Sequence, residues 1–418
     1  MKVLSFFYVT LPLILASTST SLLAEELYVT GCSSSNLNII DTKDDIPKEI
    51  DLGFPSRGMA LTHDGKVAYI AHQNDGQISV LDLSTRETIA TIQDIANPDS
   101  LAITPNGKKL YVSHKSLNTV SVIDTSSNTV IQSIQVGKNP HDIVISHDGT
   151  KAYVPNYDSG TVSIIDTQTD CAATVAVKGC PYGIALTPDD KTAYVTNNAY
   201  YYGQVNVLDT EKAEVTNTLS LNQRSIASIG ITPDGLFAYI AHPKSHVVSV
   251  LDTCTNEVAR LINTHYHPHG IAITHDGTRV YVNDRDDHML EVIDTSAEAC
   301  SPWATIALEK MPYNIKMNPL PRFSGISLSP VCGVSKKDTY LHQTEFFNVL
   351  TWLPHKKFEP THYNVFRNDE LVAVISATEP RKFEDHNLEK YQECTYHVTA
   401  ENGEQSAVLG SVSLKAGH

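Results

Sequence analysis

The chain has 418 residues, 41% of them hydrophobic, and its 47 acidic and 31 basic side chains give a net charge of −16. Because nucleic-acid binding depends mainly on clustered Lys and Arg, this acidity argues against a nucleic-acid partner. The hydrophobic content suffices for one large β-rich architecture and a small additional module.

The first 24 residues have the order of a cleavable secretory signal. Lys2 is followed by an apolar run from Val3 to Ala16 and then by small residues up to Ala24. This run is too short for a membrane-spanning helix, and no later stretch is long enough. We therefore expect an exported protein, periplasmic, secreted or at the cell surface, with no membrane span once residues 1–24 are removed.

A repeat occupies residues 25–319. Tyr-Val or Tyr-Ile pairs recur every 41 to 45 residues, beginning at Tyr28, Tyr69, Tyr111, Tyr153, Tyr194, Tyr239 and Tyr281. Each unit contains four short alternating segments; in the last unit they are GIAITHDG, RVYVN, LEVIDT and WATIAL. Alternation with β-branched residues favours strands, and Asp-Gly favours tight turns. Four strands repeated seven times at this period predict a seven-bladed β-propeller.

The two ends of the repeat complement each other. The first unit lacks the strand that should precede Tyr28, and an unassigned strand, YNIKMNP, begins at Tyr313. We expect this late strand to complete the first blade and so close the ring, because an unpaired strand edge is unfavourable.

Some segments of the repeat also indicate a family. YVTN from Tyr194, SVIDT from Ser121 and TPDG from Thr232 resemble the YVTN-repeat propellers of bacterial and archaeal surface and periplasmic proteins, over residues 27–319. The resemblance implies the propeller fold, but it leaves the function open because propellers serve many unrelated roles.

A different pattern begins after a linker at residues 320–331. Within residues 332–418, the segments NVLTWLP, HYNVFRNDELV and ECTYHVTAENG are similar to strands B, C and F of a fibronectin type III sandwich. The predicted fold class is therefore all-β, a seven-bladed propeller followed by a small fibronectin type III-like β-sandwich.

Candidate ligand-binding residues gather at one mouth of the propeller channel. In each blade the entry to the first strand and the exit from the second strand open on the same face, and counting back from the turn places Asp99 opposite His114. The same counting predicts a ring at this mouth formed by Arg57, His72, Asp99, His114, His141, Tyr182, His242, His269 and Asp284. Such groups could bind a transition metal, a small anion or a sugar. As an alternative, His72, His114 and His242 replace the Asn of the repeat in structural hydrogen bonds.

The fifth unit has two extra residues in the loop after its second strand, which contains three adjacent tyrosines, Tyr200, Tyr201 and Tyr202. Exposed amphipathic rings are typical of interfaces. We expect either a partner-binding loop on the mouth face or packing against the neighbouring blade.

Seven cysteines leave at least one thiol unpaired within the chain. Cys171 and Cys180 fall on opposite faces with a strand between them, about 30 Å of extended chain, and so should not pair. Cys254 with Cys300, and Cys332 with Cys394, are possible pairs.

Motifs of hydrolases, metalloproteases, nucleotide-binding enzymes and haem proteins are missing from the sequence. This favours a non-catalytic binding or scaffold protein whose mouth face engages a protein or glycan, with no predicted cofactor. The alternative is a periplasmic enzyme, or a redox or metal accessory protein, that uses the mouth as lactonases, lyases and copper or quinoprotein enzymes of propeller architecture do.

Overall fold

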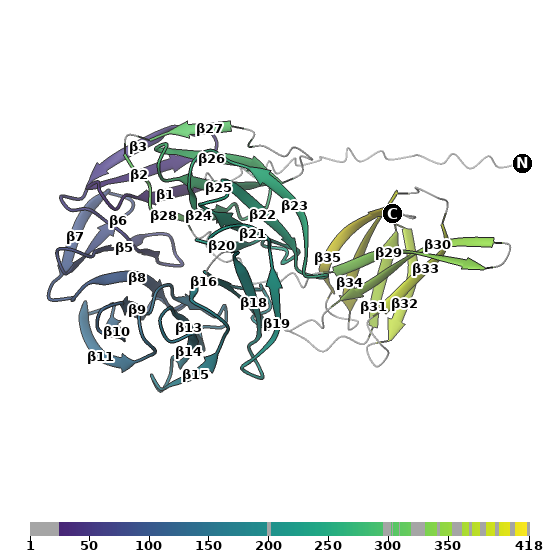
Figure 1. The fold of residues 1–418 in the computed structure, drawn as a ribbon, viewed down its shortest axis with the longest axis horizontal. Helices are drawn as coiled ribbons and strands as arrows, with labels where there is room; N and C mark the ends of the chain where they lie inside the picture. Colours follow the sequence, from purple (N-terminus) through teal and green to yellow (C-terminus); the bar gives the residue numbers. More distant parts are fainter. Residues whose placement is uncertain are drawn as a thin grey trace, which may run out of the picture.

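The computed structural model describes residues 25–198, 202–295, 302, 304–308 and 310–318, and seven further strands between residues 331 and 415. These residues form strands and turns without any helix, and hence without a helix suited to crossing a membrane. The first 28 strands form seven four-stranded antiparallel sheets arranged radially around a channel (Figure 1). The predicted seven-bladed β-propeller is confirmed.

In the first four blades, the strands lie from the channel outward in the order of the chain. The one exception among them is the innermost strand of blade 1, which comes from the end of the repeat. Blade 1 contains β28 (Asn314–Met317), β1 (Glu26–Thr30), β2 (Asn36–Asp41) and β3 (Pro47–Asp51). Blade 2 contains β4 (Met59–Leu61), β5 (Val67–His72), β6 (Gln77–Asp82) and β7 (Glu87–Ile92). Blade 3 contains β8 (Pro98–Ile103), β9 (Lys109–His114), β10 (Thr119–Asp124) and β11 (Thr129–Gln135). Blade 4 contains β12 (Val144–Ile145), β13 (Lys151–Asn156), β14 (Thr161–Asp166) and β15 (Ala172–Ala176).

The remaining three blades have the same order from the channel outward. Blade 5 contains β16 (Pro181–Leu186), β17 (Thr192–Asn197), β18 (Gln204–Asp209) and β19 (Glu214–Ser220). Blade 6 contains β20 (Ile229–Ile231), β21 (Phe237–His242), β22 (Val247–Asp252) and β23 (Glu257–Asn263). Blade 7 contains β24 (Pro268–Ile273), β25 (Arg279–Asp284), β26 (Met289–Asp294) and β27 (Ala304–Ala307).

The ring closes through pairing of its two ends in blade 1. β28 runs antiparallel to β1, with Leu27 opposite Met317 and Tyr28 opposite Lys316. Two hydrogen bonds extend the pairing, from Tyr313 N to Thr30 O at 2.7 Å and from Asn318 N to Glu26 O at 2.8 Å. The predicted closure is confirmed, and it leaves blade 1 without an unpaired inner edge.

The repeated Tyr joins each blade to the next. All seven Tyr side chains are buried, and several hydroxyl groups donate to the outer turn of the following blade. The acceptors include Asp170 for Tyr111, Asn256 for Tyr194 and Asp45 for Tyr281, at 2.7 to 2.9 Å. All three acceptors have a positive φ, a conformation that Asn and Asp tolerate better than most residues. The same turn position therefore shapes the hairpin and connects two blades.

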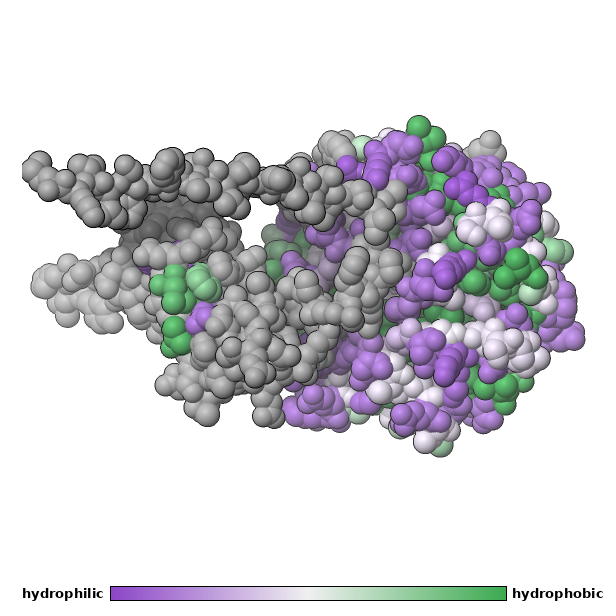
Figure 2. Space-filling model, turned by 180° about the vertical axis from the view of Figure 1, so that it is seen from behind, coloured by the Kyte–Doolittle hydropathy of each residue, from purple (hydrophilic) through white to green (hydrophobic). Residues whose placement is uncertain are grey.

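The hydrophobic core lies between blades. The cluster between blades 2 and 3, for example, contains Ile78 and Val80 of one blade with Leu101, Ile103 and Leu110 of the other. The outer strands are mostly exposed, as in β11, where only Ile134 is buried. Accordingly, the described surface in Figure 2 is largely hydrophilic with separate hydrophobic patches.

The C-terminal strands form two further sheets. One sheet contains, in order, β29 (Val331–Tyr340), β30 (Gln343–Trp352) and β33 (Lys382–Leu388). The other contains, in order, β32 (Glu370–Ser376), β31 (His362–Arg367), β34 (Glu393–Glu401) and β35 (Ser406–Lys415).

Candidate active site

Several innermost strands carry a bulge at one end of the channel. In blade 3, Leu101 pairs with Val112, as the sequence register predicts. Nearer the channel mouth the register shifts, so that Pro98, not Asp99, pairs with His114. The innermost strands of blades 5 and 7 shift in the same way, each just after a proline. A bulge places an extra residue in one strand and redirects the side chain there.

Each of the seven innermost segments contributes one residue at the level of the bulge. That residue lies five positions before the residue that directly follows the innermost strand. These residues, which we call the mouth ring, are Arg57, Asp99, His141, Tyr182, Ala227, His269 and Tyr313. All except Arg57 line one cavity of about 140 Å³ at the channel. The structure therefore brings together five of the nine predicted mouth residues, Arg57, Asp99, His141, Tyr182 and His269, and adds Tyr313.

Charged groups of the mouth centre on Asp99. Arg57 Nη1 lies 2.7 Å from one carboxylate oxygen of Asp99, and Lys115 Nζ lies 2.9 Å from the other. The side chain of Asp99 is 7% exposed, while those of Arg57 and Lys115 keep 25% and 20%. Two cations share one carboxylate, so this cluster has a surplus positive charge.

Aromatic rings and imidazoles complete the mouth. The His141 ring lies 4.4 Å from the Tyr182 ring, and the His269 ring lies 4.9 Å from the Tyr313 ring, between centroids. Tyr182 and Tyr313 are hydrogen-bonded to each other through their side chains. The Arg57 guanidinium lies 4.7 Å from the centre of the Tyr313 ring, a cation–π contact.

Burial keeps both imidazoles neutral. It lowers the pKa of His141 to about 3, with a further decrease caused by Lys115 and an opposing effect of Asp99. It lowers the pKa of His269 to about 3 as well, and Arg285 adds to this effect. At neutral pH each ring therefore has one nitrogen that accepts and one that donates a hydrogen bond.

A second carboxyl group, Asp142, lies at the same cavity. It accepts hydrogen bonds from Ser100 Oγ at 3.1 Å and from Ile143 N at 2.9 Å. Burial raises the pKa of Asp142, and the nearby charge of Lys316 opposes this effect. Lys316 lines both this cavity and a second, mainly apolar cavity of about 250 Å³.

The mouth is positive although the whole chain is acidic. Arg57 and Lys115 outweigh Asp99, and Arg285 lies 5.7 Å from the centre of the Tyr313 ring. Because His141 and His269 are neutral, they do not change this balance. A small anion with a polar body matches the combination of cations, imidazoles and phenols.

Three predicted mouth residues lie instead inside the blade walls. The rings of His72, His114 and His242 are 0 to 2% exposed. In each, one nitrogen contacts a Ser hydroxyl at 2.8 Å and the other a backbone carbonyl. This is the structural role that the sequence left as an alternative. In blade 3 the register shifts between Pro98 and Leu101, so that Asp99 lines the cavity while His114, at the end of the second strand, stays in the blade wall.

Asp284, the remaining predicted mouth residue, is also buried in a blade wall, where it occupies the position of these histidines. Of the predicted partner-binding loop, Tyr202 is exposed, and Tyr200 and Tyr201 lie outside the described residues.

The sequence interpretation missed Lys115, Tyr313, Asp142 and Arg285. Tyr313 was placed in the closing strand but not in the ring. A comparison of equivalent positions could have found Asp142, because the other innermost strands have Gly, Ser or Asn there. Lys115 and Arg285 each directly follow a second strand, where no periodic pattern constrains side-chain direction.

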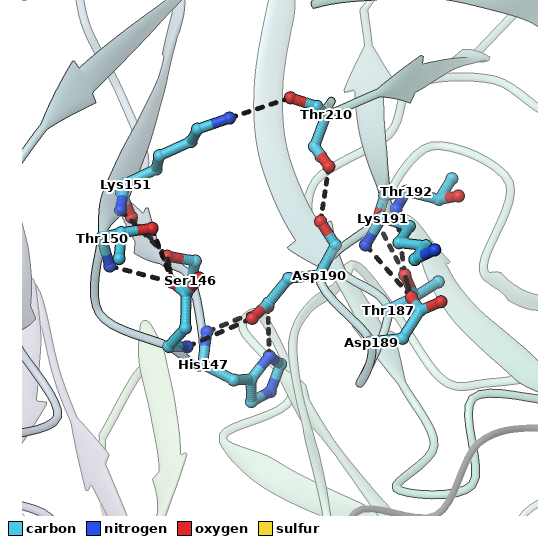
Figure 3. A network of polar contacts seen from close by, with 11 residues as sticks. Ser146, His147, Thr150, Lys151, Thr187, Asp189, Asp190, Lys191, Thr192 and Thr210 are labelled. Carbon is cyan, nitrogen blue, oxygen red and sulfur yellow. Dashed lines mark hydrogen bonds and ion pairs between the residues drawn. The ribbon is translucent and has the colours of Figure 1, made fainter. Parts of the chain in front are cut away.

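On the opposite face, turn histidines connect neighbouring blades, as Figure 3 shows for blades 4 and 5. His147 contacts Asp190 through its ring, at 2.5 Å, and donates its backbone N–H to the same carboxylate. Lys151 Nζ bonds to Thr210 O at 3.1 Å, and Thr210 Oγ1 donates to Asp190 O. This network has a structural role and is separate from the mouth.

The described residues include three free cysteines, one disulfide-bonded cysteine and no candidate metal site. Cys32, Cys171 and Cys180 are free thiols, which confirms that Cys171 and Cys180 do not pair. Cys254 takes part in a disulfide, whereas its suggested partner, Cys300, lies outside the described residues. Within the described part of the chain, no three His, Cys, Asp or Glu side chains are arranged to hold a metal ion.

Comparisons with known proteins agree on the architecture. A family model described as Lactonase, 7-bladed beta-propeller, matches residues 48–178, which is less than half of the chain. None of the curated proteins matches. Among solved structures, hydrazine synthase from Kuenenia stuttgartiensis is 21% identical with a TM-score of 0.59, over 63% of this chain and 90% of that one.

Two other solved structures are comparably similar. A protein from Bacteroides uniformis, provisionally assigned as a 6-phosphogluconolactonase, is 18% identical with a TM-score of 0.60, over 71% of this chain and all of that one. The dihydro-heme d1 dehydrogenase NirN is 14% identical with a TM-score of 0.54, over 69% of this chain and 74% of that one. Identities this low establish the fold alone.

The match to a lactonase model corrects one prediction. A non-catalytic binding or scaffold protein was expected because familiar catalytic motifs are missing, but the matching model is that of an enzyme fold group. The absence of motifs is weak evidence in a propeller, because a site that is assembled from single residues of different blades leaves no contiguous motif. The chain is thus a seven-bladed β-propeller, and its residues 48–178 match the lactonase model.

Proposed function

We propose that this protein is an enzyme that hydrolyses a small lactone or related cyclic ester carrying an anionic group, and that the mouth ring is its active site. The observation that carries the proposal is the cluster of Arg57, Asp99 and Lys115 beside the neutral ring of His141. The match to the lactonase model and the solved 6-phosphogluconolactonase-like structure support the reaction class.

The cations position the substrate in this proposal. Arg57 and Lys115 contact its carboxylate or phosphate, because a surplus positive charge in a partly dry site favours an anion. Tyr182 and Tyr313 are hydrogen-bonded to each other, and the hydroxyl group that accepts in this pair donates its own hydrogen to the ester carbonyl, where negative charge develops during attack by water.

His141 accepts the proton of the attacking water in this mechanism. Its Nδ1 lies 3.9 Å from Asp99 Oδ2, so the carboxylate stabilises the imidazolium that forms. Burial lowers the pKa of His141 most, and the charges of Lys115 and Arg57 lower it further; a bound anion offsets these two charges and so raises the pKa in part. The His141 imidazolium then gives this proton to the ring oxygen as the acyl C–O bond breaks, which regenerates the neutral imidazole. The ring-opened product loses its carboxyl proton to water, carries one more negative charge than the lactone and leaves the mouth.

A panel of lactones tests this proposal directly. We expect the protein to hydrolyse a phosphorylated or carboxylated lactone faster than the uncharged sugar lactone. The acid that hydrolysis releases is measured in a pH-stat. His141→Gln should lower kcat by about 100-fold or more, and Arg57→Gln should mainly raise KM. His147→Gln, on the opposite face, is the matched control and should leave both constants unchanged. Absence of hydrolysis of every lactone above the uncatalysed rate would refute the proposal.

We also propose that the protein is exported and that residues 332–418 form a fibronectin type III-like domain. The signal-like order of residues 1–24 and the disulfide at Cys254 support export. The strand order β29-β30-β33 and β32-β31-β34-β35 corresponds to sheets A-B-E and C′-C-F-G of such a domain, which supports the second proposal. Cell fractionation tests the first; limited proteolysis, with cleavage expected between residues 319 and 331, tests the second.

A further inference from the structure

A hydrogen-bonded pair recurs in the blade walls. It joins the last residue of the second strand to the third residue of the third strand, as in His72 with Ser79 at 2.8 Å. The equivalent pairs are His114 with Ser121, Asn156 with Ser163, and His242 with Ser249, at 2.8 to 2.9 Å. These two positions therefore bring side-chain polar atoms into direct contact in blades 2, 3, 4 and 6.

In blade 7 the same two positions hold two acids, Asp284 and Glu291. Asp284 pairs with Met289, which puts Glu291 at the same diagonal register as the Ser of the other blades. Both acidic side chains are 0% exposed. The repeat thus predicts a carboxyl–carboxyl contact in a dry wall, where two adjacent negative charges cannot both persist.

The hydrogen bonds of the two groups leave one oxygen of each unused. Asp284 Oδ1 accepts from Asp287 N at 3.3 Å, and Glu291 Oε1 accepts from the backbone N–H of His265 at 2.8 Å and from its ring. Among the described residues, Asp284 Oδ2 and Glu291 Oε2 have no hydrogen-bond partner although both are buried. A buried acceptor without a donor is costly, and a proton on one oxygen would satisfy both.

We propose that Asp284 and Glu291 form a binding site for one proton, held as a carboxylic acid–carboxylate hydrogen bond in place of the His–Ser bond of blades 2, 3 and 6. Glu291 is the carboxylate of the pair because His265 donates to it twice. Asp284 is the acid, and its hydroxyl donates to Glu291 Oε2. The inference concerns the blade wall and does not depend on the proposed lactone hydrolysis.

The surroundings of the pair are consistent with this assignment. Burial raises the pKa of Asp284 to about 7, with the charge of Glu291 acting in the same direction and backbone hydrogen bonds opposing. Burial also raises the pKa of Glu291, whereas His265 lowers it. The other charged or titratable groups near the pair are Arg285, Asp286, Asp287, His267 and, from blade 6, His246.

The direction of the pH effect follows from linkage. Asp284 binds its proton more tightly in the folded chain than in the unfolded chain, where its pKa is about 4. Its contribution to stability is therefore complete at acid pH and is lost as the pH rises from about 4 to about 7. Above that range the wall of blade 7 holds two carboxylates, beside the segment that carries Arg285 to the mouth.

Thermal unfolding of the full chain between about pH 5 and pH 9 tests the proposal. Asp284→Asn keeps a hydrogen-bond donor toward Glu291 at every pH. We expect the Tm of the wild type to decrease relative to that of Asp284→Asn as the pH rises from 5 to 7.5. The expected decrease is several degrees, which corresponds to a loss of about one to two kcal/mol of unfolding free energy. Asp286→Asn is the matched control, because Asp286 lies on the same segment and its side chain is 58% exposed; it should keep the wild-type pH dependence.

Two outcomes would overturn the proposal. One is a constant difference in Tm between wild type and Asp284→Asn at all pH values, which means that no proton is shared. The other is a rise in the wild-type Tm on addition of Ca²⁺ or Mg²⁺ at pH 8 that Asp284→Asn abolishes, which means that a cation occupies the site. If Asp284→Asn does not fold, Asp284→His combined with Glu291→Ser restores the pair of blades 2, 3 and 6. That variant should then be more stable than wild type at pH 8, and lower stability there would contradict the proposal.

Discussion

Arg57 and Asp99 join blades 2 and 3 at the channel mouth, with Arg57 Nη1 2.7 Å from Asp99 Oδ1. Lys115 binds the other oxygen of the same carboxylate at 2.9 Å. Asp99 thus holds two cations that would otherwise repel each other. The residue has both a structural role and, in the proposed mechanism, a role in orienting His141.

The first prediction concerns Asp99. Asp99→Asn should lower the free energy of unfolding by about 2 to 3 kcal/mol, because it leaves Arg57 and Lys115 partly buried without their carboxylate. Urea unfolding measures this change. Glu211→Gln is the control, since Glu211 is 70% exposed and 3.7 Å from Lys191, and it should cost less than about 0.5 kcal/mol. Equal effects of the two substitutions would contradict the assigned role of Asp99.

The second prediction separates wall histidines from mouth histidines. His114→Asn should retain much of the wild-type stability, because Asn156 fills the same position in blade 4 and bonds to Ser163. His114→Ala should cost about 2 to 4 kcal/mol, as it removes a buried ring and leaves Ser121 without its partner. Activity per folded molecule should be unchanged in both variants. A loss of kcat in the stable His114→Asn variant would place His114 in the active site.

The third prediction concerns acid pH. The folded-state pKa of His141 lies below its unfolded value of about 6.5. Its contribution to stability is therefore present above pH 6.5 and is lost as the pH falls toward 3. At pH 5 this loss amounts to about 2 kcal/mol. His141→Gln should reduce the difference in unfolding free energy between pH 7 and pH 5 by about that amount, in urea titrations at the two pH values; an unchanged difference would show that His141 is protonated in the folded chain.

The fourth prediction concerns the disulfide at Cys254. A reductant should lower the Tm of the full chain, because a disulfide restricts the unfolded state and contributes about 2 to 4 kcal/mol. Cys254→Ser should lower the Tm as well and should reduce the further decrease that the reductant causes. Cys171→Ser is the control, since Cys171 is a free and exposed thiol. Differential scanning calorimetry with and without reductant measures all three.

The propeller was predictable from the sequence because its signals are repeated. Tyr111 and Tyr153 are each the third residue of a second strand, and each is buried against a neighbouring blade, so one assignment supports the next. The same repeat predicts the closing strand, because the first unit lacks its innermost strand and another segment must supply it. The pairing of β28 with β1 confirms this prediction.

The candidate site was predictable only in part. The register counted from the turn is correct up to Leu101 but shifts before Pro98, and an alternating pattern contains no sign of a one-residue bulge. That shift separates Asp99, which faces the cavity, from His114, which lies in the wall. Lys115 was missed because it lies beyond the last periodic residue of its strand, where only the folded chain determines direction.

The pairing of β28 with β1 has a consequence for biogenesis. The strand that finishes blade 1 is almost the last part of the ring to leave the ribosome, about 290 residues after its neighbour in the sheet. Until Ile315 meets Val29, the nascent chain presents two open sheet edges and cannot complete the circle. The ring therefore cannot close before its final strand has been synthesised, which is compatible with the export proposed above for the unfolded chain.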